Sequence, residues 1–223
     1  MKILFSLPFA FAEPVLHRVT RDSNASVEPE AGRLEVGTGG EDRRYVQLVD
    51  QIKYFNPAFD HRKFWAYGCN CLLLGDRPMS DPGWGPPIDA LDTVCKHYKD
   101  CAQCAKKKHG EMCINEFVRY KYSKTQYANG NSMCRDAPNS CARDLCECDF
   151  AFAKAHYPAI DVFNYDYHLF WTTTNWYPED NCPQPPGSVP VAPQCCYSLT
   201  GPAVIYNSLT HTCDASGAIT KNE

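Results

Sequence analysis

The residues of this chain with the most definite chemistry are its 14 cysteines, in a sequence of 223 residues. Thiols present in an even number typically pair into disulfides in an oxidising compartment. None precedes Cys69, ten lie between Cys69 and Cys148, and four lie between Cys182 and Cys213. Thiolates also bind zinc, but an even, clustered set in a chain of this size favours a disulfide framework in a secreted protein.

The remaining polar residues indicate little other chemistry. No serine, histidine and aspartate arrangement suits nucleophilic catalysis, and no glycine-rich loop suits phosphate binding. A net charge of −4 and an isoelectric point near 6.0 predict no general attraction to nucleic acid or to an anionic membrane. Lys96, Lys99 and the run Lys106-Lys107-Lys108-His109 could form a basic patch for anionic lipid or sulfated glycans. A solvated helix end whose lysines complement the helix dipole is the favoured interpretation.

The first residues are typical of a leader. Lys2 precedes an apolar run, and Ala10 and Ala12 occupy the −3 and −1 positions of a small-residue cleavage site. We therefore expect a signal peptide over residues 1–12, with a buried strand as the alternative. No other stretch approaches about 20 apolar residues, so we expect no transmembrane segment.

Residues 13–44 are polar, rich in acids, arginine and glycine, and have no periodic apolar face. Such a segment buries too little surface to offset the entropy lost on ordering. We predict a disordered pro-segment that ends at the basic pair Arg43-Arg44; an exposed pair that is not cleaved is the alternative. Asn24 begins the chain's glycosylation triplet within this segment.

Three helices must position the cysteines. The first runs from Tyr45 to Phe55 with apolar residues at helical spacing, and Asn56-Pro57 ends it. The second is predicted to begin at Pro86-Pro87, and the third to follow the capping pair Asn139-Ser140. The second and third each carry one apolar stripe with cysteines: Ile88, Leu91, Cys95, Tyr98, Ala102 and Ala105; Cys141, Leu145, Cys148, Phe152 and Ala155.

The segments around these helices are shorter. The aromatic-rich stretch from Phe117 to Tyr127, with Asn129-Gly130 behind it, predicts a short β-hairpin. Residues 157–223 form an extension rich in aromatic residues, proline and cysteine. The predicted fold class is therefore mainly α and disulfide-rich, with two long antiparallel cross-linked helices, a short β-hairpin and a loop-rich C-terminal extension.

Four ordered motifs carry a resemblance to a known family: Tyr67-Gly68-Cys69-Asn70-Cys71, Pro87-Ile88-Asp89-Ala90-Leu91-Asp92, Cys95 with Cys101, and Cys141-Ala142-Arg143-Asp144-Leu145-Cys146-Glu147-Cys148-Asp149. In order and spacing they are similar to Y-G-C-Y-C, P-x-D-x-L-D, C-C-x-x-H-D-x-C and C-x4-C-x-C-D of secreted phospholipase A2. The resemblance covers residues 45–156 and implies a phospholipase A2-like domain there.

The resemblance also implies a set of disulfides: Cys71–Cys95, Cys101–Cys148, Cys113–Cys141 and Cys134–Cys146. One bridge of the family is missing as a whole, because Val94 stands at one of its cysteines and Ala155 at the other. Cys69 with a tail cysteine such as Cys182 is the family-like expectation. The pairing of Cys104, Cys195, Cys196 and Cys213 stays open.

The catalytic pair of the family is replaced in this chain. Counting from Cys95 to Cys101 places Tyr98 at the histidine that acts as general base and Lys99 at the aspartate that binds calcium. A phenol with a pKa near ~10 is a poor base at neutral pH, and an ammonium cannot ligate a hard cation that takes oxygen donors. His97 and Asp100 stand on either side, but one residue turns a helix by ~100°, so neither occupies the same face.

The calcium loop of the family departs independently. Glycines are expected after Cys71, whereas Leu72-Leu73-Leu74-Gly75 stands there, followed by an insertion from Asp76 to Pro86. The degenerate loop residues are Asn70, Leu72 and Leu74, and side chains there should prevent the loop conformation. Asp149 keeps the position of the aspartate that orients the histidine, and we expect it to act as a structural hydrogen-bond acceptor.

The resemblance therefore implies a secreted, extracellular, non-catalytic phospholipase A2-like protein that uses no cofactor. Its expected partner is an extracellular protein, a matrix or a lipid surface. Non-catalytic domains of this scaffold occur in otoconins, and the tail with Cys195-Cys196 and Cys213 is similar to galaxin-like matrix proteins. The alternative is a calcium-dependent phospholipase A2 that hydrolyses the sn-2 ester of phospholipids, for which Ca²⁺ would be the cofactor.

Overall fold

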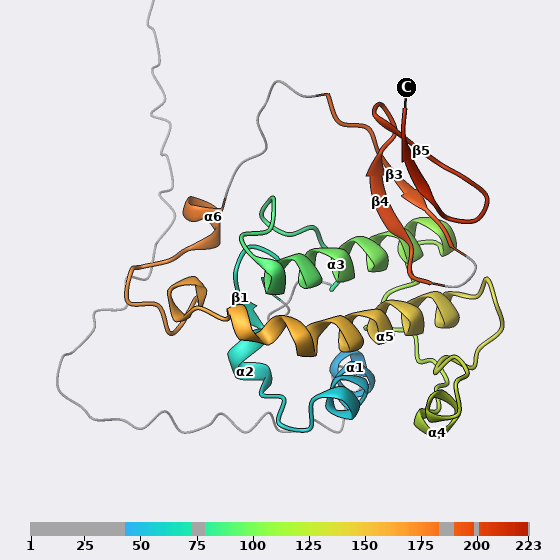
Figure 1. The fold of residues 1–223 in the computed structure, drawn as a ribbon, viewed down its shortest axis with the longest axis horizontal. Helices are drawn as coiled ribbons and strands as arrows, with labels where there is room; N and C mark the ends of the chain where they lie inside the picture. The colour runs from blue at the N-terminus through green and yellow to red at the C-terminus, as the bar shows by residue number, and fades with distance from the viewer. Residues whose placement is uncertain (1–42, 73–78, 183–189, 199–200, 223) are drawn as a thin grey trace, which may run out of the picture. The chain divides into compact units, whose positions relative to one another are not determined.

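The computed structural model describes residues 43–72, 79–182, 190–198 and 201–222 (Figure 1). The predicted signal peptide, residues 1–12, and the predicted pro-segment up to residue 42 lie outside the described residues. None of the helices in the described ranges is both long and apolar enough to cross a bilayer.

The first helix, α1 (Arg43–Phe55), forms where the apolar periodicity predicts it. Its inner face carries Leu48 and Ile52, both fully buried. The helix ends at Asn56, whose backbone N–H donates to the carbonyl of Ile52 at 2.8 Å. The basic pair Arg43-Arg44 forms the start of this helix, two residues earlier than the sequence pattern indicates.

Two long helices form the centre of the fold: α3 (Ala90–His109) and α5 (Cys141–Ala159). They lie side by side in Figure 1 and run in opposite directions. Ser140 caps α5, as predicted, by accepting from the backbone N–H of Arg143 at 3.2 Å. The predicted start of α3 at Pro86-Pro87 is wrong. Asp89 caps the helix instead, because its carboxylate accepts from the backbone N–H of Asp92 at 2.8 Å.

Short elements connect the helices. The helix α2 (His61–Phe64) leads into β1 (Ala66–Tyr67), which pairs antiparallel with β2 (Cys71–Leu72). This pairing makes the turn that carries Cys69 and Asn70 against α3.

The hairpin predicted from residues 117–127, with Asn129-Gly130 behind them, forms only in part. Residues 124–128 form a short helix instead, α4 (Lys124–Ala128). Ser123 caps this helix, because its hydroxyl oxygen accepts from the backbone N–H of Gln126 at 3.2 Å. The antiparallel pairing lies further apart along the chain, in an isolated bridge between Tyr122 and Cys134.

The C-terminal extension has more regular structure than its composition indicates. It contains η1 (Ile160–Val162), η2 (Tyr165–Tyr167) and α6 (Pro178–Asn181). Two hairpins follow: β3 (Pro193–Cys196) pairs with β4 (Val204–Asn207), and β5 (His211–Cys213) pairs with β6 (Ile219–Lys221). The strand β4 packs against α3.

Seven disulfides hold the described residues together. The four pairs that the resemblance implies are all bonded: Cys71–Cys95, Cys101–Cys148, Cys113–Cys141 and Cys134–Cys146. Cys69 is bonded to Cys182. The pairs that stayed open are Cys104–Cys195, which ties the extension to α3, and Cys196–Cys213, which ties the two hairpins together.

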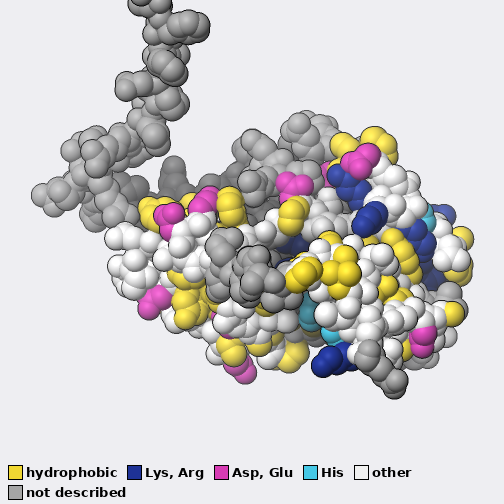
Figure 2. Space-filling view, turned by 90° about the horizontal axis from the view of Figure 1, so that it is seen from above, with side chains coloured by type: hydrophobic (Ala, Val, Ile, Leu, Met, Phe, Trp, Pro, Cys, Tyr) yellow, Lys and Arg dark blue, Asp and Glu magenta, His cyan; other side chains and the backbone are white. Residues whose placement is uncertain are grey.

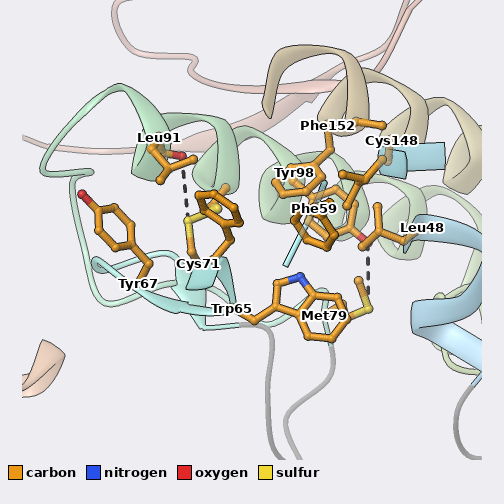
Figure 3. Packing of buried hydrophobic residues seen from close by; sticks show 14 of the residues in the cluster. Leu48, Phe59, Trp65, Tyr67, Cys71, Met79, Leu91, Tyr98, Cys148 and Phe152 are labelled. Carbon is orange, nitrogen blue, oxygen red and sulfur yellow. Dashed lines mark hydrogen bonds between the residues drawn. A yellow bond between two sulfur atoms is a disulfide. The ribbon is translucent and has the colours of Figure 1, made fainter. Parts of the chain in front are cut away.

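The main hydrophobic core lies between α1, α3 and α5 (Figure 3). Aromatic and aliphatic side chains from the connecting segments complete it. Its largest members include Leu48, Phe59, Trp65, Tyr67, Met79, Leu91, Tyr98 and Phe152.

Candidate functional site

The two helices bring Tyr98 and Asp149 together. Cys101–Cys148 joins α3 to α5, and Asp149 follows one of these cysteines while Tyr98 lies about one turn before the other. The Tyr98 hydroxyl donates a hydrogen bond of 3.0 Å to Oδ1 of Asp149. Both side chains are buried. Tyr98, which the resemblance places at the family's histidine, is therefore hydrogen-bonded to Asp149, which the resemblance places at the aspartate that orients the histidine.

Two further side chains complete the shell of Asp149. The Tyr120 hydroxyl donates to Oδ2 at 2.5 Å, and the Asn115 amide donates to Oδ1 at 2.9 Å. Gln51 on α1 donates in turn to the Tyr120 hydroxyl at 2.8 Å. A buried carboxylate without donors would be costly, and here three donors from different segments supply its hydrogen bonds.

The electrostatics of this cluster follow from burial. Removal from water raises the pKa of Asp149 to about 7, although its three hydrogen bonds act in the opposite direction. Burial and the neighbouring Asp149 raise the pKa of Tyr98 well above its ordinary value. Tyr98 therefore keeps its proton at neutral pH and acts as a hydrogen-bond donor, the opposite of the role of a general base.

The resemblance places Lys99 at the family's calcium-binding aspartate. Lys99 is buried, and its ammonium donates to the backbone carbonyl of Asp81 at 3.1 Å. A divalent cation needs oxygen ligands at this place, and an ammonium offers none and repels the ion. The residues present therefore do not fit calcium. Within the described ranges, no three His, Cys, Asp or Glu side chains lie close enough to hold a metal ion.

Met79, which belongs to the insertion after the calcium-loop position, packs against the hydroxyl end of Tyr98. Its side chain is 1% exposed, and its Sδ lies 3.9 Å from the Tyr98 hydroxyl. Figure 3 shows it beside Trp65, with its sulfur turned toward Tyr98. The backbone N–H of Met79 donates to the carboxylate of Glu116 at 2.8 Å, which fixes the segment in place. Met79 thus occupies the space next to the hydroxyl end of Tyr98.

The structure describes only part of the segment that the resemblance places at the family's calcium loop. Asn70 is fully buried, and its backbone N–H and side-chain amide both donate to Asp92, at 2.7 and 3.1 Å. A Cβ added at Gly83 would lie 2.0 Å from Oδ1 of Asn70, so the insertion passes this side chain where only a glycine fits. The Leu72 side chain and the whole of Leu74 lie outside the described residues.

The neighbours of the Tyr98-Lys99 pair do not form a substitute pair. His97 is exposed, and Asp100 forms an ion pair with Lys96 one turn earlier on α3. Neither bonds to Asp149 in the described structure. This result matches the expectation that adjacent positions of a helix point to different faces.

The lysine-rich end of α3 is compensated locally. Lys106 pairs with Glu111 at 2.7 Å, and Lys108 and His109 both contact Asp144 at 2.8 Å. Figure 2 shows basic side chains mainly at the side of the molecule that carries this helix end and the hairpins. The pairing favours a solvated helix end over a strong anion-binding surface.

Sequence reasoning missed three members of this site. Tyr120 lies in the segment predicted as a hairpin and Asn115 lies two residues before it. Met79 lies in the insertion, for which no element was predicted. The excess of aromatic residues after Phe117 was the available signal, because a buried phenol needs a polar partner.

No protein-family model matches the chain. A region of 137 residues is 34% identical to basic phospholipase A2 homolog 2 of Bothrops asper, covering 61% of this chain and 85% of that protein. Group IID secretory phospholipase A2 of Homo sapiens is 30% identical over 126 residues, which are 56% of this chain and 77% of that protein.

A third relative is basic phospholipase A2 DE-1 of Hemachatus haemachatus, 33% identical over 115 residues. The matched region covers 50% of this chain and 86% of that relative. The relatives thus include proteins named as phospholipases and proteins named as homologs of them. With the disulfide framework and the two cross-linked helices, these similarities show that the chain belongs to the phospholipase A2 family.

Proposed function

We propose that this chain is a secreted, non-catalytic member of the phospholipase A2 family that binds a partner outside the cell. The observation that carries the proposal is the bond from the Tyr98 hydroxyl to Asp149. In this arrangement Tyr98 and Asp149, at the positions of the catalytic histidine and its orienting aspartate, form a buried structural contact. Phospholipid hydrolysis needs a base that takes a proton from water, and Tyr98 holds its proton.

The surroundings of Tyr98 support the same conclusion. Lys99 directs its ammonium to the carbonyl of Asp81, where an active enzyme of this family would need a carboxylate for calcium. Met79 fills the space in which a water and an ester would have to meet Tyr98. The residue at the position of the base, the residue at the position of the metal ligand and the access of water and substrate to them are therefore all altered.

Secretion and the binding role are supported by the disulfides and by the relatives. Seven disulfides in the described residues are typical of an oxidising compartment, and one relative is named a secretory phospholipase A2. Several relatives are named phospholipase A2 homologs. The partner that we propose is an extracellular protein, a matrix or a lipid surface.

The alternative function is calcium-dependent hydrolysis of the sn-2 ester. It is favoured by the relatives that are named phospholipase A2. The geometry of Tyr98 and Lys99 opposes it.

Hydrolysis of phosphatidylcholine vesicles, with and without millimolar calcium, distinguishes the two functions. We expect no release of fatty acid above the level of a buffer control, with the human group IID enzyme as positive control. Calcium-dependent hydrolysis by the full chain that is lost in Asp149→Asn would overturn the proposal. Co-sedimentation with the same vesicles tests whether the partner is a lipid surface.

A further inference from the structure

The two long helices and the C-terminal extension enclose an apolar pocket of about 170 Å³. Its walls come from three places: Val94, Tyr98 and Cys101 on α3, Ala151, Phe152 and Ala155 on α5, and Pro202, Ala203 and Val204 of the extension. We propose that this pocket binds a small uncharged molecule built on a single six-membered ring.

The floor of the pocket is rigid and aromatic. Cys101–Cys148 closes it at the bottom, and the rings of Tyr98 and Phe152 lie in contact, with centroids 4.9 Å apart. The Tyr98 hydroxyl is bonded to Asp149, so that its polar group is already satisfied. A ligand therefore meets mainly carbon and sulfur on this side, and an apolar ligand gains from leaving water there.

Small side chains at one position of each helix explain why space remains. Val94 and Ala155 stand where the resemblance places the two cysteines of a bridge, and neither fills the gap between α3 and α5. The extension then covers the gap, held by the disulfide Cys104–Cys195. The helices leave the gap at Val94 and Ala155, and the roof of the pocket comes from a segment outside the predicted phospholipase A2-like domain.

The mouth determines the charge of the ligand. Asp100 lines the pocket but is 8% exposed and is paired with Lys96, so its charge is already compensated. His97 is exposed at the rim and can reach a hydroxyl of the ligand. An ionised ligand group would lose water and gain no opposite charge, which selects an uncharged molecule with at most one small polar substituent.

The volume determines the size of the ligand. A dry apolar cavity of ~150 Å³ in another protein takes up benzene, so this pocket suits one ring with a short substituent. For about eight heavy atoms, we expect a dissociation constant of about 1 mM or tighter. The inference does not depend on the proposed loss of catalysis, because the pocket is lined chiefly by the outer residues of the helix pair.

Titration of the full chain with benzyl alcohol, followed by NMR chemical shifts of backbone amides, tests the inference. We expect saturable shifts at Val94, Ala155 and Ala203. Ala155→Phe fills the mouth and should weaken binding at least tenfold. The matched control is Lys154→Phe, which places the same ring at the next, exposed position outside the pocket and should leave binding unchanged.

A second pair of variants alters the roof, in case the helix variant does not fold. Val204→Trp should also weaken binding at least tenfold, whereas Val191→Trp, at an exposed position that does not line the pocket, should not. Circular dichroism shows whether each variant is folded. The inference is overturned if the native chain shows no saturable shifts, or if folded filling variants bind as tightly as their controls.

Discussion

Replacing Asp149 by asparagine removes an ionisable group from the centre of the cluster and keeps its shape. Burial and the negative Glu116 raise the pKa of Asp149 from 3.8 to about 7 in the folded protein. In the pH range between these values, the folded chain binds a proton that the unfolded chain has released. The contribution of this group to stability is therefore fully present below pH 3.8, and it is lost as the pH rises through about 7.

The size of the effect follows from the shift. Each pKa unit corresponds to ~1.36 kcal/mol, so the difference from 3.8 to about 7 amounts to about 4 kcal/mol. His156 acts in the opposite direction, because burial lowers its pKa from 6.5 to about 4. Its neutral form is favoured in the folded protein, and stability from this residue rises with pH over that range. The pH profile of the native chain alone would therefore conceal both effects.

The assay is guanidinium unfolding followed by circular dichroism, at pH values from about 4 to about 8. The unfolding free energy of the native chain minus that of Asp149→Asn should fall by about 4 kcal/mol between pH 4 and pH 8. The control is Asp161→Asn, which changes an exposed carboxylate beyond α5. A difference between the native chain and Asp149→Asn that does not vary with pH would refute the assignment of a buried, protonated carboxyl.

Three further predictions concern calcium, Met79 and His156. Millimolar calcium should not raise the melting temperature, because Lys99 stands at the position of a calcium ligand. If calcium did bind, a concentration 100 times the dissociation constant would add about 2.7 kcal/mol to the free energy of unfolding. A calcium-dependent melting shift that disappears on changing Lys99 would contradict this prediction. Met79→Ala should lower the free energy of unfolding by about 2–5 kcal/mol, because it empties a buried position. The control Met112→Ala, at an exposed position, should change it by less than about 0.5 kcal/mol. His156→Phe should make the protein more resistant to acid, because burial lowers the pKa of His156 from 6.5 to about 4. The free energy of unfolding should rise by up to about 3 kcal/mol at pH 4. Equal acid-unfolding midpoints for this variant and the native chain would contradict the prediction.

Much of the framework could be predicted from the sequence because its signals are local. Apolar periodicity and capping residues such as Ser140 identify helices without reference to distant parts of the chain. The spacing of Cys101 and Cys148 within ordered motifs carries the resemblance and, with it, the bridge between the helices. The same counting places Tyr98 and Lys99 at the family's catalytic pair.

The closing contacts could be determined only by the tertiary structure. Met79 reaches Tyr98, and Tyr120 reaches Asp149, across loops whose course no local pattern encodes. Cys104 could have paired with several tail cysteines, and only the packing of β3 and β4 on α3 brings Cys195 to it. Side-chain packing between segments far apart in sequence depends on all of them at once, and for that physical reason the filled site and the apolar pocket appear only in the folded chain.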